Sequence, residues 1–107
     1  MNLLLRLQRW YGSYCDGDWE HTYGITIGTI DNPGWTLSVN IEDTDLEEAV
    51  YESVTVERSP EDWYQCFVRE KIFEGAGGAG NLTDLISTFL EWAEPIEASR
   101  RPTGDNG

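Results

Sequence analysis

The chain has 107 residues, which is typical of a single domain, and 39% of them are hydrophobic, enough for a core that needs no disulfide. Its 20 acidic and seven basic side chains give a formal net charge of −13, which disfavours binding to nucleic acid or to an anionic membrane surface and favours a basic partner. No stretch reaches the roughly 20 apolar residues of a membrane span, and no signal peptide is recognisable, so we expect a cytoplasmic protein.

Most of the basic residues lie near the two ends of the chain. Arg6 and Arg9 fall in the first ten residues, and Arg100 and Arg101 fall in the last ten. Between residues 14 and 98 there are 19 acidic and three basic side chains, a local charge of −16. The middle of the chain is therefore expected to present an acidic surface, which either attracts a basic partner or serves solubility alone.

Residues 2–13 are predicted to form an amphipathic helix, because apolar side chains recur at the spacing of one helical face. The stretch from Tyr14 to Trp35 follows, and we expect the other elements to pack around it. It begins with an acidic turn at residues 16–18, after which residues 19–21 are expected to start a strand. The apolar face of the helix consists of Leu3, Leu7, Trp10, Tyr11 and Tyr14.

A β-hairpin is predicted next. Side chains alternate with period two over residues 21–30, and again from Trp35 to Ile41. The Asp-Asn-Pro-Gly sequence at residues 31–34 is a turn of the length that joins two hairpin strands. His21, the only histidine, is expected at the start of the first strand.

Two or three further strands are predicted after an acidic connection. The first of them carries Val50, Val54 and Val56 on its inner face. Pro60 separates it from the next strand, whose bulky side chains on both faces indicate a strand that is either central or covered on both sides. The connection spans residues 43–48, and the strands span residues 50–57, 63–70 and, as a short fifth strand, 72–73.

A glycine-rich segment, residues 74–80, is predicted to be a flexible loop that leads into a second long helix. Asn81 is the expected cap of this helix, and Pro95 is expected to end it. We therefore expect one domain over residues 1–96 and a disordered tail over residues 97–107. The apolar stripe of the helix consists of Leu82, Leu85, Ile86, Phe89, Leu90 and Ala93.

These elements predict an α+β fold. Strands that follow one another through short turns need no crossover, so they are expected to form an antiparallel meander sheet of four or five strands. The apolar stripes of the N-terminal and C-terminal helices need to be buried, and the inner face of the sheet is the surface that can cover them. Both helices are therefore expected to pack on the sheet.

Three patterns could indicate catalysis or ligand binding, but each lacks a feature that the function requires. Cys15 and His21 suit a nucleophile and its base, but no context of a known thiol enzyme surrounds the cysteine, and we expect both cysteines of the chain to be reduced. Asp16, Asp18 and Glu20 lack the spacing of a calcium-binding EF-hand loop. The glycine-rich segment lacks the Gly-Lys-Ser/Thr ending of a phosphate-binding loop. No cofactor or metal is therefore predicted.

The acidic side chains form two groups that we predict to contact a basic partner, because such a surface steers association with a cationic protein. Trp19 lies within the first group and is expected either to anchor that contact or to close the core, with the core favoured. The first group is Asp16, Asp18 and Glu20, and the second group is Glu42, Asp43, Asp45, Glu47 and Glu48.

Several short motifs spread over the chain occur together. The most specific are Gly-Asp-Trp-Glu at residues 17–20 and Asn-Pro-Gly-Trp at residues 32–35; others are Trp10-Tyr11, Tyr23-Gly24, Asp62-Trp63, Phe73–Gly78 and Phe89–Ala93. In these motifs the chain resembles the immunity protein 53 family, over roughly residues 8–93. The resemblance implies an α+β protein encoded beside a bacterial polymorphic toxin, which it neutralises by binding.

We therefore expect a non-catalytic immunity protein that occludes a toxin domain through its acidic surface. The charge favours a basic toxin, such as a nuclease, as the partner, and neither nucleic acid nor membrane. Two alternatives remain open on the sequence alone. One is a small enzyme that uses Cys15 or the cluster of Asp16, Asp18 and Glu20, and the other is an acidic mimic of nucleic acid that captures basic proteins. The sequence does not indicate an oligomeric state.

Overall fold

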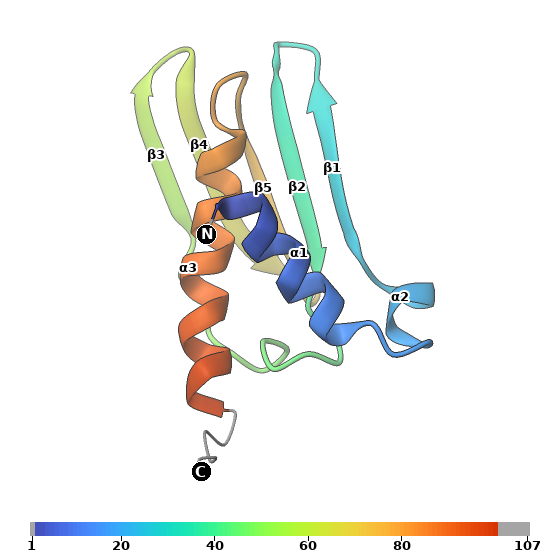
Figure 1. The fold of residues 1–107 in the computed structure, drawn as a ribbon. Helices are drawn as coiled ribbons and strands as arrows, with labels where there is room; N and C mark the ends of the chain where they lie inside the picture. Colours follow the sequence, from blue (N-terminus) through green and yellow to red (C-terminus); the bar gives the residue numbers. More distant parts are fainter. Residues whose placement is uncertain (1, 101–107) are drawn as a thin grey trace.

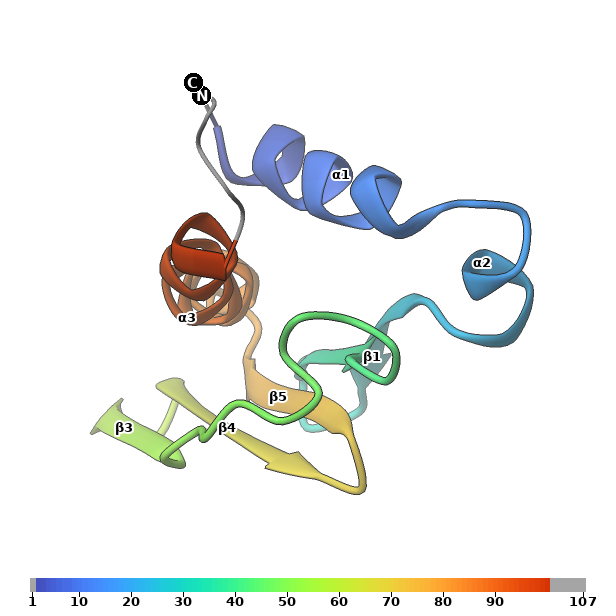
Figure 2. The same ribbon diagram turned by 90° about the horizontal axis from the view of Figure 1, so that it is seen from below.

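The computed structural model describes residues 2–100, which form an α+β fold with five antiparallel strands and two long helices on one face of the sheet (Figures 1 and 2). The predicted fold class is confirmed. The elements are α1 (Leu3–Tyr14), α2 (Trp19–Thr22), β1 (Ile25–Ile30), β2 (Gly34–Asn40), β3 (Val54–Ser59), β4 (Asp62–Arg69), β5 (Ile72–Gly78) and α3 (Leu82–Arg100).

The strand order, β1-β2-β5-β4-β3, departs from a simple meander at one point. β1 and β2 form the predicted hairpin, and β3, β4 and β5 follow one another as a meander, but β5 then pairs with β2, with Gly75 opposite Leu37. The connection over residues 41–53 therefore carries the chain along one end of the sheet, from β2 to the far edge (Figure 1). This topology places β5 at the centre and leaves β1 and β3 at the edges.

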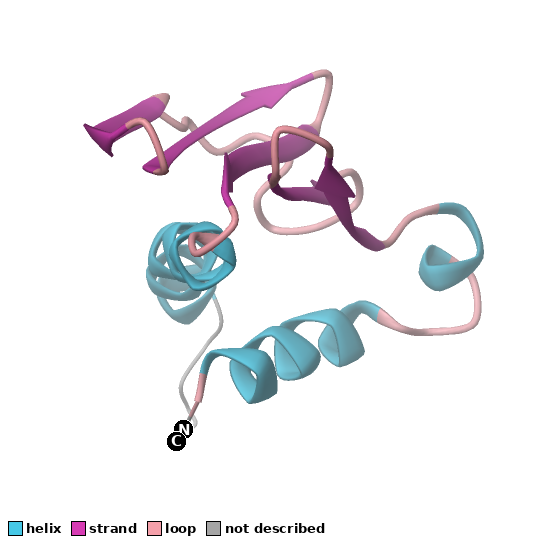
Figure 3. Cartoon of the chain, turned by 90° about the horizontal axis from the view of Figure 1, so that it is seen from above, coloured by secondary structure: helices cyan, strands magenta, loops and turns pink. Residues whose placement is uncertain are grey.

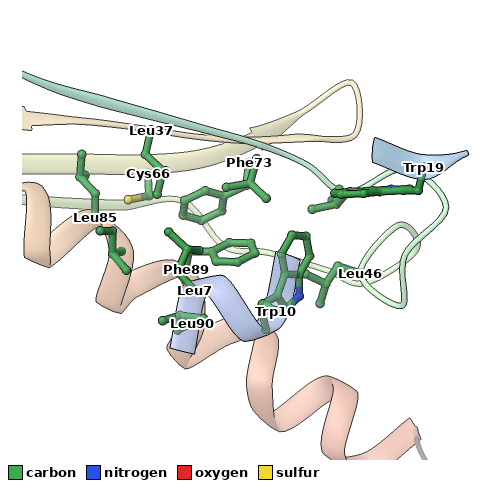
Figure 4. Close-up of a cluster of buried hydrophobic side chains, with 14 residues drawn as sticks. Leu7, Trp10, Trp19, Leu37, Leu46, Cys66, Phe73, Leu85, Phe89 and Leu90 are labelled. Atoms are coloured by element: carbon green, nitrogen blue, oxygen red, sulfur yellow. The ribbon is translucent and has the colours of Figure 1, made fainter. Parts of the chain in front are cut away.

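The core lies between the sheet and the helices, which share one side of it, as the view along the sheet shows (Figure 3). Phe73 of β5 and Phe89 of α3 meet edge to face at its centre, with ring centroids 5.1 Å apart (Figure 4). The buried apolar residues are Leu7, Trp10, Trp19, Leu37, Val39, Ile41, Leu46, Cys66, Phe73, Leu85, Ile86, Phe89, Leu90 and Ala93.

The prediction that residues 74–80 form a flexible loop is wrong, because residues up to Gly78 belong to the central strand. Glycine is needed there for the close approach of α3. A Cβ added at Gly75 would lie 3.0 Å from the Leu85 side chain, and one at Gly77 would lie 3.0 Å from the Cβ of Asn81. The glycines thus form a shallow track on the sheet into which the start of α3 packs.

The first strand begins later than predicted, because residues 19–22 form the single helical turn α2. The Asp16 carboxylate accepts hydrogen bonds from the amides of Asp18 and Trp19, at 2.9 and 3.0 Å. An acidic side chain in this position favours the start of a helix over an extended chain. His21 is therefore a helical residue at the surface and not the first residue of the sheet.

The third strand also begins later than predicted, at Val54. Val50 was expected on the inner face but is 85% exposed. Its carbonyl oxygen accepts a hydrogen bond from the Trp92 indole at 3.1 Å. The backbone at this position is thus held by α3 and not by a neighbouring strand.

The prediction that Pro95 ends the C-terminal helix is wrong, since α3 continues through it to Arg100. Residues 97–100, which were assigned to the tail, are helical, and residues 101–107 lie outside the described part of the chain. A proline inside a helix costs about 3 kcal/mol, because it removes one hydrogen bond and crowds the preceding turn. Contacts made after the proline must offset that cost.

Glu97 provides such contacts. It is 8% exposed, and its carboxylate accepts a hydrogen bond from the Trp10 indole at 2.6 Å and one from the Tyr14 hydroxyl at 2.7 Å. Hydrogen bonds to a charged acceptor contribute more than neutral ones. Glu97 therefore ties the last turns of α3 to α1.

We expect Gly78→Ala to lower the free energy of unfolding by about 1–3 kcal/mol, the range for overpacking. The reason is that the added Cβ would lie 2.5 Å from the backbone carbonyl oxygen of Glu61. Urea unfolding followed by tryptophan fluorescence measures the change. Gly80→Ala is the matched control, because nothing lies within 4 Å of a Cβ at that position. Equal stabilities of the two variants would contradict the close packing around β5.

We expect the two cysteines to differ sharply in reactivity. Burial raises the pKa of the Cys66 thiol to about 12, so this thiol stays protonated at neutral pH, whereas Cys15 is exposed. An aromatic disulfide reagent should modify one thiol of the native protein quickly and the second only after unfolding. Cys15→Ser should abolish the fast phase. Fast modification of both thiols in the native protein would show that the core is open at Cys66.

Candidate functional site

A surface cleft of about 330 Å³ opens beside the C-terminal end of α1. Asp16 and Asp18 line it from the turn between α1 and α2, and Asp43 lines it from the connection after β2. The structure thus brings members of both predicted acidic groups to one place. The lining residues are Ser13, Tyr14, Asp16, Asp18, Trp19, Thr22, Tyr23 and Asp43.

Two carboxylates of the first group hold the turn together. While Asp16 accepts from the amides that follow it, Glu20 reaches back and accepts from the amides of Asp16 and Gly17, at 2.9 and 2.8 Å. These bonds lower the pKa of both carboxyls: the Trp19 amide is the main cause for Asp16, and the amide of Glu20 itself is the main cause for Glu20. Both side chains are therefore ionised and occupied within the turn.

Asp18 and Asp43 are different, because both are exposed and neither is paired. Among residues 2–100, no hydrogen-bond donor contacts either carboxylate, and neither takes part in an ion pair. Asp43 also has a positive φ of 62°, a conformation that Asp tolerates better than most residues. These two carboxylates are free to meet a cation from outside.

Glu47 stabilises the connection that carries the second acidic group. One of its oxygens accepts from the Asp43 amide at 3.1 Å, and the other lies 2.6 Å from the Lys71 ammonium. Lys71 is the main reason that the pKa of Glu47 is lowered. Glu47 thus orders the connection around Asp43. The remaining predicted acids, Glu42, Asp45 and Glu48, lie on the same connection without lining the cleft.

Trp19 belongs to the core, as the sequence favoured, and only 5% of it is exposed (Figure 4). Its ring lies against Trp10 and Tyr14, with centroids 6.0 and 5.8 Å away, and its indole donates to the Glu42 carbonyl oxygen at 2.9 Å. The alternative, an exposed anchor for a partner, does not fit this burial. Trp19 instead joins the two sides of the cleft.

Tyr23, which was not among the predicted site residues, lines the cleft where α2 ends. Burial, together with the charges of Glu42 and Asp43, raises the pKa of its hydroxyl, so Tyr23 is a neutral group in acidic surroundings. The available signal was Asp18, a preferred N-cap residue type directly before Trp19. It predicts a helical turn, in which Trp19 and Tyr23 lie four residues apart on one side.

The structure does not assemble the alternative catalytic pair. Within the described part of the chain, no hydrogen bond joins Cys15 and His21, and the Cys15 thiol lies 3.4 Å from the Tyr11 carbonyl oxygen, to which it donates. The same residues contain no group of three or more His, Cys, Asp or Glu side chains placed to hold a metal ion. No helix within residues 2–100 is long and apolar enough to cross a membrane.

The fold and the cleft define a small α+β domain with an acidic hollow at the end of its first helix. The model of the immunity protein 53 family matches residues 4–94, and the chain belongs to this family. The family implies neutralisation of a toxin, so the partner of the chain is a cognate toxin. No curated protein and no solved structure matches the chain.

We expect acid to loosen the turn at residues 16–20. The folded-state pKa values of Asp16 and Glu20 are lowered, so their contribution to stability is present above the unfolded pKa values and is lost as the pH falls through the folded ones. Carboxyl carbon resonances followed by NMR from pH 6 to 2 measure both values, and the Gly17 amide should shift with Glu20. Midpoints at or above those of unstructured peptides would contradict the role of these carboxylate–amide hydrogen bonds in holding the turn.

Proposed function

We propose that the chain neutralises its toxin by direct binding without catalysis, and that Lys and Arg side chains of the toxin contact the acidic cleft. The protein would do so in the cytoplasm of the bacterium that makes the toxin. The observation that carries this proposal is that the unpaired carboxylates of Asp18 and Asp43, from two separate segments, line one hollow.

The arrangement of these charges supports a cationic partner. Like charges gathered at one place repel one another, and they lower stability unless something compensates them. Here Asp16, Glu20 and Glu47 are compensated by backbone amides or by Lys71, and their bonds hold the segments that carry Asp18 and Asp43. A cationic side chain in the cleft would relieve the repulsion that remains.

The partner that best fits this surface is a basic toxin domain, of which a nuclease is one kind. Its net charge would be opposite to the −13 of this chain, which accelerates encounter. A stable complex buries about 1,600 Å² in total, so the contact must extend beyond the cleft. The exposed Glu48 on the same connection adds to the field that a toxin would meet first.

The double variant Asp18→Asn, Asp43→Asn should lower the association rate with the toxin about tenfold and change the dissociation rate much less, because exposed charges act mainly on encounter. Stopped-flow fluorescence at low and high salt measures both rates. Glu57→Gln with Glu61→Gln is the matched control, since it removes two exposed charges, one in β3 and one in the turn before β4. Equal association rates for the two double variants would contradict the assignment of the cleft.

Co-expression tests the wider proposal. Cells that make the toxin encoded beside this gene should survive when the chain is present, and the two proteins should elute together from a sizing column. Asp18→Asn, Asp43→Asn should protect less well than the control pair when expression is low. Equal cell death with and without the chain, together with separate elution, would rule out neutralisation by binding.

A further inference from the structure

β1 is an edge strand without the features that normally prevent edge pairing. Its six residues, Ile25–Ile30, include no charge and no proline, in a chain where 25% of the residues are charged. The strand at the other edge, β3, carries Glu57 and Arg58 and is followed by Pro60. Charges and prolines at an edge stop its free backbone groups from pairing with another chain. The edge at β1 is open to such pairing.

The pairing of β1 with β2 shows which backbone groups are free. The Asn40 amide donates to the Gly24 carbonyl oxygen at 3.0 Å, so Gly24 points its backbone toward β2. Successive residues of an antiparallel strand point these groups to opposite sides. The N–H and C=O groups of Ile25, Ile27 and Thr29 therefore point away from the sheet. In Figure 1 no element lies beside this edge, and α2 lies only beyond its lower end.

An apolar groove of about 390 Å³ adjoins this edge on the helix side of the sheet. It exists because α1 covers β1 only in part: Ile27, which points to the helix side, is still 39% exposed. A strand added beside β1 would project every second side chain toward this groove. The groove is lined by Leu7, Gln8, Tyr11, Tyr23, Gly24 and Ile25.

The groove and the acidic cleft meet at Tyr23, which lines both. We propose that an extended segment of the toxin pairs with β1 as a sixth strand. Its helix-facing apolar side chains fill the groove, and a Lys or Arg at the end beside Ile25 reaches Asp18 and Asp43. This inference rests on the proposed function, because the toxin is the occupant.

Charge selects the toxin over a second copy of this chain as the occupant. Pairing of two β1 strands would bring together two molecules that each carry a net charge of −13. Such a dimer would also leave the acidic cleft of each molecule without a cation. A basic segment from another protein meets the open edge and the cleft with the opposite charge.

Thr29→Pro tests the strand addition, because it removes one outward N–H and leaves the pairing with β2 in place. Thr55→Pro is the matched control: Thr55 is likewise an exposed threonine of an edge strand, and its N–H points away from β4. In a titration with the toxin domain encoded beside this gene, Thr29→Pro should weaken binding about tenfold or more, because a buried carbonyl of the added strand loses its donor. Thr55→Pro should change binding less than about twofold.

Hydrogen exchange of the wild-type complex provides a second measurement that does not depend on the folding of any variant. The amides of Ile25, Ile27 and Thr29 should become protected when the toxin domain binds. Tight binding without that protection, or with equal affinity for both proline variants, would overturn the strand addition and leave the proposed function standing. A wild-type chain that does not bind the toxin domain overturns both. A wild-type dimer that Thr29→Pro dissociates would assign the edge to a second copy and overturn the choice of occupant.

Discussion

The close contact between α3 and the glycines of β5 determines how the two helices are placed on the sheet. Without side chains at Gly75 and Gly77, the helix lies directly against the central strand. Asn81, which is 2% exposed, then locks its first turn, because its amide donates to Asp62 at 2.9 Å and to Asp84 at 2.8 Å. The height of the helix above the sheet and its position along the sheet are both set at this end.

The cleft follows from that placement through contacts at the other end of α3. Arg6 of α1 pairs with Glu94, with its guanidinium 2.6 Å from the carboxylate, and Glu97 holds the end of α1. Burial and the bond to Glu97 raise the pKa of Tyr14, so its hydroxyl stays protonated, and it also accepts from the Asp45 amide at 3.2 Å. α3 thus positions α1, and α1 positions the connection that carries Asp43.

Periodicity revealed most of the fold. The apolar stripes of α1 and α3 and the alternation over β1, β2 and β4 gave the correct elements because each reports which side of an element is buried. The glycines of β5 carried no such signal, since their function is to let α3 approach. Pro95 was misjudged for a related reason, because the contact of Glu97 with Trp10 and Tyr14, which holds the helix beyond the proline, joins residues more than 80 positions apart.

The acidic residues could be selected from the sequence, but their separate roles could not. Asp16 and Asp18 are the same residue type, yet the Asp16 carboxylate accepts from two backbone amides at the start of a helical turn while that of Asp18 faces solvent unpaired. The difference arises from the backbone geometry of residues 16–20. The sequence pattern had predicted a strand from residue 19 onward, where the structure has a helical turn. Asp18 and Asp43 lie in one cleft because the residues next to them are joined: the Trp19 indole donates a hydrogen bond to the Glu42 carbonyl oxygen.

The acidic cleft and the open edge of β1 would contribute differently to the selection of one toxin. Unpaired carboxylates act over several ångströms and attract basic proteins in general, so by themselves they confer rate more than selectivity. Backbone pairing at an open edge acts only at contact distance, and the groove beside it accepts side chains of limited shape. In the proposed complex a partner would have to satisfy both, with its cation placed at Tyr23, where groove and cleft join. A mimic of nucleic acid needs only the general attraction between its carboxylates and basic proteins. An uncharged open strand edge would give such a mimic no advantage.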